Sequence, residues 1–149
     1  MKKVWIYLSD KELKGELLNS VLNEGSEFVQ NWKAHEMPLN ATFEVLNDRF
    51  IVVSVDETTY NASGCSIDKL LRLIKQLEAD HKIQLLNRLL VGYKTQNGVE
   101  VVPSSLIKEK LASKQLDENT LIYNVAVSDS KEFENWLQPL KETWLKKYL

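Results

Sequence analysis

The residue types best suited to chemistry gather in the segment "SGCS", residues 63–66. Cys65 lies at or next to the expected start of a helix, where the helix dipole and unpaired amide groups lower the pKa of a thiol. Ser63, Gly64 and Ser66 would let the same amides bind an oxyanion, because Gly64 permits close approach. The segment therefore predicts a reactive thiol or an anion site. A structural interpretation stays open, in which Cys65 is a small buried hydrophobic residue and the serines only cap the helix.

Three further polar residues belong to the same candidate site. His35 closes an expected helical stretch, and Asp56 and Glu57 follow an apolar segment. A Cys–His pair with an acid nearby can activate a nucleophile, with His35 as the base and Asp56 orienting it. Glu57 joins the serines and Gly64 as a candidate ligand-binding residue. The alternative is that both acids are solvated loop residues or partners of a helix dipole.

No metal or cofactor is predicted. One cysteine and one histidine with an acid fall short of the four ligands of a structural zinc site. The segment "FIVVSVDE", residues 50–57, is similar to the metal-binding strand of a P-loop ATPase. That chemistry also needs the motif G-x-x-x-x-G-K-[ST], and none of the five glycines stands in it. We therefore expect no ATP turnover.

Composition narrows the class of protein. The 149 residues suit a single domain, 1–149, and the net charge of -2 offers no broad basic field for nucleic acid. No run approaches the length of about 18 apolar residues that a membrane span needs. One cysteine and no export signal favour a cytoplasmic location. The expected partner is a small anion or a protein segment, not nucleic acid or a membrane.

Hydrophobic periodicity gives the expected order of elements. A helix from about residue 12 to residue 32 should break or kink at Gly25-Ser26, because glycine is poor in helix interiors. A second helix is expected up to His81, a short third helix after Pro103, and a final helix carrying Phe133 to Leu145. Strands are expected over residues 3–8, 41–46, 49–55, 88–94, 99–102 and 121–127.

The order through residue 94 is β-α-β-β-α-β, which predicts an α+β fold with a ferredoxin-like sandwich over residues 3–94. In that topology His35, Asp56 and Cys65 reach the same end of the sheet. One sheet face would remain open, so a C-terminal β-α-β-α extension is expected to cover it. Self-association as a homodimer is the alternative cover. A three-layer α/β sheet is the second architecture considered.

Four segments together carry a family resemblance: "FVQNWKAH", "RFIVVSVDE", "SGCSIDK" and "WLQPLKETWLKKYL". The chain resembles a small family of uncharacterised bacterial proteins of about this length that are often labelled "ABC transporter ATPase". The resemblance implies that residues 63–68, Asp56, Glu57 and His35 belong to the family pattern, and it supplies no substrate. Members tend to have glycine after the motif histidine, where this sequence has Glu36.

Two hypotheses of function follow. The first is a binding or interaction module, self-associating, in which the 56–66 loop holds a small anion or a partner segment. The alternative is a thiol-dependent enzyme that uses Cys65 with His35 as its base.

Overall fold

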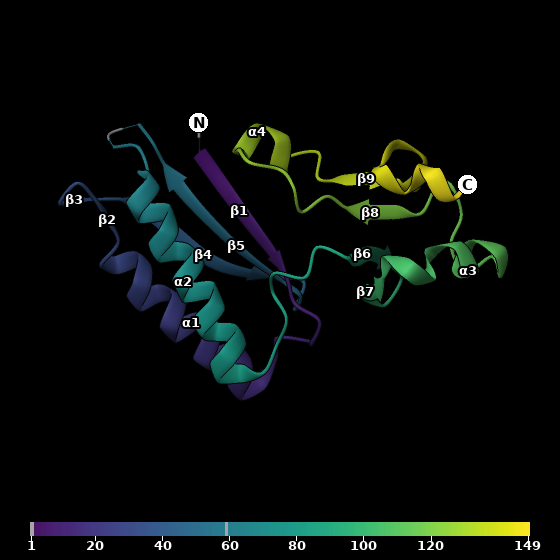
Figure 1. Ribbon diagram of the computed structural model, residues 1–149, viewed down its shortest axis with the longest axis horizontal. Coiled ribbons are helices and arrows are strands. Elements are labelled where there is room, and N and C mark those ends of the chain that lie inside the picture. The colour runs from purple at the N-terminus through teal and green to yellow at the C-terminus, as the bar shows by residue number, and fades with distance from the viewer. Residues whose placement is uncertain (1, 59) are drawn as a thin grey trace.

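The computed structural model describes residues 2–58 and 60–149 and shows an α+β chain with antiparallel sheets and four α-helices (Figure 1). No helix in these described ranges is long and apolar enough to cross a membrane. The elements are β1 (Lys2–Leu8), α1 (Gly15–Gln30), β2 (Lys33–Ala34), β3 (Met37–Pro38), β4 (Asn40–Leu46), β5 (Phe50–Asp56), α2 (Gly64–His81), β6 (Leu90–Thr95), β7 (Gly98–Pro103), α3 (Ile107–Ala112), β8 (Leu121–Tyr123), α4 (Ser130–Phe133) and β9 (Leu137–Pro139). Short 3-10 helices cover Ser104–Leu106, Leu140–Glu142 and Trp144–Tyr148.

The first sheet has the strand order β1-β5-β4, with both pairs antiparallel. Its register is continuous: Asp56, at the end of β5, lies between Lys2 of β1 and Asn40 of β4. The strand β5 is central and buried on both faces, as its uninterrupted apolar sequence predicts. The turn between β4 and β5 has positive φ at Asn47 and Asp48, the residue types that tolerate it best.

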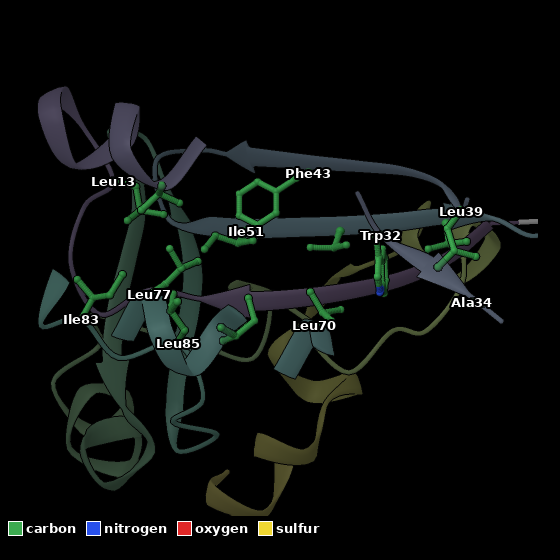
Figure 2. Packing of buried hydrophobic residues seen from close by; sticks show 14 residues of the cluster. Leu13, Trp32, Ala34, Leu39, Phe43, Ile51, Leu70, Leu77, Ile83 and Leu85 are labelled. Atoms are coloured by element: carbon green, nitrogen blue, oxygen red, sulfur yellow. The ribbon is translucent and has the colours of Figure 1, made fainter. Parts of the chain in front are cut away.

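The helices α1 and α2 cover one face of this sheet and enclose the main core (Figures 1 and 2). Leu70, Ile74 and Leu77 of α2 are completely buried there, and they recur at helical spacing. The prediction of a break at Gly25-Ser26 is wrong, because α1 continues from Gly15 to Gln30. A Cβ placed on Gly25 would lie 2.3 Å from Cδ1 of Phe43, so glycine lets the helix approach β4 closely.

The fourth strand of the expected sandwich does not join the first sheet. The strand β6 pairs with β7 and β8, in a second sheet of order β7-β6-β8-β9. Only β1, β5 and β4 therefore keep the ferredoxin-like order, and the complete sandwich over residues 3–94 is not formed. Gly92 of β6 lies against the side chains of Phe50 and Leu8, at the end of the first sheet where β1 finishes and β5 begins, and β6 does not pair with β1.

The C-terminal part of the chain covers the sheet face opposite the helices, as expected. Val4, Ile6 and Phe50 from the first sheet share a buried cluster with Tyr123 and Val127. Trp136 packs on Phe50 and Tyr123 with ring centroids 4.9 and 4.8 Å apart. The expected final helix is wrong: α4 has four residues, and the strand β9 follows it because residues 137–139 pair with β8.

Candidate functional site

Reciprocal hydrogen bonds between two serines begin α2. The Ser63 hydroxyl accepts from the Ser66 amide at 3.2 Å, and the Ser66 hydroxyl accepts from the Ser63 amide at 2.7 Å. This capping box confirms the structural role considered for the serines. Cys65 is exposed, so its interpretation as a buried hydrophobic residue is wrong. Within the described residues, the amides of Gly64 and Cys65 donate to no acceptor in the chain.

The acids of the preceding loop are engaged in local hydrogen bonds. The Asp56 carboxylate accepts from the Thr58 hydroxyl and, at 3.0 Å, from the Thr58 amide. These two bonds, the hydroxyl first, lower the pKa of Asp56 from its ordinary value. The Glu57 carboxylate accepts from the Ala62 amide at 2.8 Å and so closes the loop from the other side. Asp56 and Glu57, which the sequence predicts as functional residues, therefore stabilise the conformation of the loop. Thr59 lies outside the described residues.

His35 lies in the tight turn of a small hairpin and not at the end of a helix. The helix α1 ends at Gln30, and β2 and β3 then pair directly across His35 and Glu36. Both turn residues have positive φ, 51° and 68°. The turn therefore forms with Glu36, a non-glycine residue, at its second position. His35 is exposed.

A buried hydrogen bond joins the hairpin to the first turn of α2. The indole N–H of Trp32 donates to the Ser66 carbonyl oxygen at 2.8 Å, and Trp32 is only 2% exposed. Trp32 lies beside Leu39 and Ala34 in the core (Figure 2). Since the hairpin continues directly into β4, whose first residue pairs with Asp56, the segments that carry His35, Asp56 and Cys65 reach one end of the sheet.

Convergence of these segments does not create a catalytic set. Among the described residues, no hydrogen bond connects the side chains of His35, Asp56 and Cys65. Asp56 instead binds Thr58, which leaves no oriented acid for a Cys–His pair. No group of three or more His, Cys, Asp or Glu suited to a metal occurs within residues 2–58 and 60–149.

A groove beside this end of the sheet was not found by sequence reasoning. It is a shallow, open depression of about 480 Å³ between the C-terminal part of α1 and the N-terminal half of α2. Phe28 and Trp32, with ring centroids 5.1 Å apart, form its apolar part together with Leu73. Its polar rim consists of Glu24, Glu27, Asn31 and Lys69.

One rim residue is fixed by a contact between the two helices. The Glu24 carboxylate lies 2.7 Å from Nε2 of His81, at the end of α2. Both side chains are partly buried, so this contact holds Glu24 against α2 while Glu27 stays exposed. The helical periodicity predicts that Phe28 and Trp32 face the core. It does not predict that a surface depression exposes part of the core beside these two residues.

Comparisons of the chain with protein-family models, curated proteins and solved structures find no match.

Proposed function

We propose that this protein is an interaction module that binds a partner segment in the groove between α1 and α2, next to the 56–66 loop. The groove supports this proposal because it joins an apolar surface to polar groups on its rim, which is the usual composition of a binding site. Its volume of about 480 Å³ is large enough for one or two side chains of a partner.

The apolar part of the groove is suited to an aromatic or aliphatic anchor. Phe28 and Leu73 are only half-buried although they pack against the main core. Trp32 beneath them is held by its hydrogen bond to Ser66, so less side-chain freedom of Trp32 is lost when a partner binds. An anchor side chain would complete the burial of Phe28 and Leu73.

The rim sets the charge of the partner. Glu24 and Glu27 come from α1, whereas Lys69 comes from α2 on the other side. A segment with a basic residue beside its apolar anchor would pair with the α1 side. A carboxylate or backbone carbonyl of the same segment would accept from Lys69.

A protein segment is favoured over a small anion for the same region. Two of the donors that an anion would use, the Ser63 and Ser66 amides, are occupied by the capping box. Only the Gly64 and Cys65 amides remain, and the first turn of α2 contains no basic side chain. The 56–66 loop therefore contributes mainly by positioning Ser66 under Trp32.

A selection with phage-displayed random peptides tests the proposal. Peptides selected on the native protein should share an apolar residue next to Lys or Arg. They should lose binding to Leu73→Glu, which puts a charge in the groove, and keep binding to Leu71→Glu. Leu71 is 39% exposed on the same helix and does not line the groove, so it is the matched control. Peptides that bind both variants equally would contradict the proposal.

The alternative function, a thiol-dependent enzyme, depends on the exposed Cys65. It requires a thiol that reacts fast near neutral pH. We expect His35→Ala to leave the rate of iodoacetamide labelling of Cys65 unchanged, because no hydrogen bond among the described residues joins Cys65 to His35. Fast labelling at pH 6 that slows in His35→Ala would instead support the enzyme.

A further inference from the structure

The outer edge of β4 differs from the other edges of the three-stranded and four-stranded sheets. The outer edge of β1 is closed at one end, where the Val4 amide donates to the Ser128 carbonyl and Lys3 bridges Asp129. The edge strands of the second sheet, β7 and β9, both end in prolines, which cannot donate to a partner strand. The strand β4 has seven residues and no described partner on its outer side.

Nothing in β4 blocks the addition of another strand. Edge strands are usually guarded by lysine, proline, a bulge or very short length. The sequence of β4, "NATFEVL", has one charged residue, and its pairing with β5 is unbroken from Asn40 to Leu46. Every second residue therefore directs its N–H and C=O groups to the open side.

The helix α1 provides an apolar surface above this edge. Since α1 packs on β4 and against α2, the flank of α1 away from α2 lies over the outer side of β4. Leu18, Leu22 and Val29 share that flank at helical spacing, and each is only half-buried. A strand added about 4.8 Å from β4 would place alternate side chains against these three residues.

A second copy of the chain does not fit this edge. Symmetric pairing of two β4 strands would bring the two α1 helices to within about one strand spacing, roughly 5 Å. Packed helices need about 8–10 Å between their axes. The occupant must therefore be an extended segment that carries no helix above it.

We propose that the outer edge of β4 binds an extended segment of a partner protein by strand addition. In the bound segment every second side chain faces α1, and these side chains are apolar. On the sheet face opposite α1, β4 exposes Thr42 and Glu44. The bound segment therefore carries Lys or Arg on that face, where the basic side chain can pair with Glu44. This surface is distinct from the groove between α1 and α2.

A display library of seven-residue peptides, the length of β4, tests this surface. Every second position is drawn from Val, Ile, Leu and Phe, and the other positions from Lys, Arg, Thr and Asp. Selected peptides should carry Lys or Arg, and Glu44→Lys should weaken their binding about fivefold. The control Glu118→Lys, at an exposed residue far from β4 in the sequence, should leave binding unchanged.

Hydrogen exchange followed by NMR provides the structural readout. On addition of a selected peptide, the amides of alternate residues within Asn40–Leu46 should become protected, and Leu73→Glu should not change this. The proposal is overturned if no peptide is selected or if the protected amides lie elsewhere. It is also overturned if the same amides are protected in the free protein in proportion to its concentration, which would show a second copy on this edge.

Discussion

Replacing Gly25 with alanine tests the contact that positions α1 on the sheet. An ideal Cβ at Gly25 lies 2.3 Å from Cδ1 of Phe43 and 2.4 Å from its Cε1 and Cγ, so the methyl group would overlap the face of the ring. Phe43 is 8% exposed and belongs to the main core, which limits how far the ring can move.

The magnitude follows from two opposing effects. Alanine in a helix interior is more favourable than glycine by about 1 kcal/mol. Overpacking a core typically costs about 1–3 kcal/mol. Because three ring atoms are contacted at once, we place the overpacking cost near the upper limit. The expected net change is a loss of about 1–2 kcal/mol in the free energy of unfolding, or about 2–8 °C in Tm.

Thermal and urea unfolding, followed by circular dichroism, measure this change. The control is Ser26→Ala at the next, exposed residue, which should change stability by no more than about 0.5 kcal/mol. In a Phe43→Leu background the effect of Gly25→Ala should shrink, because the two residues are in contact. A rise in Tm for Gly25→Ala, as expected for a glycine with free space around it, would refute the close approach of α1 to β4.

Three further predictions concern the hairpin, the C-terminal cover and the acidic loop. Glu36→Gly should stabilise the protein by about 0.5–1 kcal/mol in urea unfolding, because φ is 68° there; destabilisation would show that the turn differs. A chain ending at residue 120 should be insoluble or molten, because it lacks Tyr123, Val127 and Trp136 and each large buried side chain contributes about 1.5–3 kcal/mol; a soluble, cooperatively melting product would contradict this. The pKa of Asp56 is lowered by Thr58, so its stabilising contribution is complete above its unfolded pKa and is lost as pH falls through the lower folded value. Asp56→Asn should therefore remove part of the loss of stability below about pH 4, and an unchanged pH profile would speak against the Asp56–Thr58 contact.

The sequence predicted most elements because their signals are local. The alternation in β4, the apolar run of β5 and the period of α2 all correspond to observed elements. The hairpin β6–β7 also forms, but its turn falls on Gln96 and Asn97, one residue earlier than the expected Asn97-Gly98.

The errors arose where a contact between distant residues decided the outcome. Gly25 was read as a helix breaker because its partner, Phe43, lies 18 positions further along the chain (43 − 25). The order of elements predicts that β6 belongs to the sandwich of residues 3–94, whereas its pairing with β8 depends on Ile122, far along the chain. Trp136 is predicted in a helix, but it packs on Phe50 and the three residues after it pair with β8 as β9.

For the candidate site, sequence predicted the neighbourhood but not the roles. The start of α2, its serine cap and the approach of three segments to one sheet end follow from topology. The hydrogen bond from Trp32 to Ser66 and the groove beside it could not be predicted, because they depend on how the ends of two helices sit relative to each other.

The most direct test of the proposed function is the NMR signal of the Trp32 indole N–H during titration with a groove-selected peptide. Trp32 lines the groove and its indole is bonded to Ser66, whereas Trp136 lies on the other face of the sheet. We expect the Trp32 indole signal to shift in a saturable manner while the Trp136 indole signal stays in place. Saturable binding that leaves the Trp32 signal unchanged, or that moves the Trp136 signal instead, would contradict the assignment of the groove as the binding site.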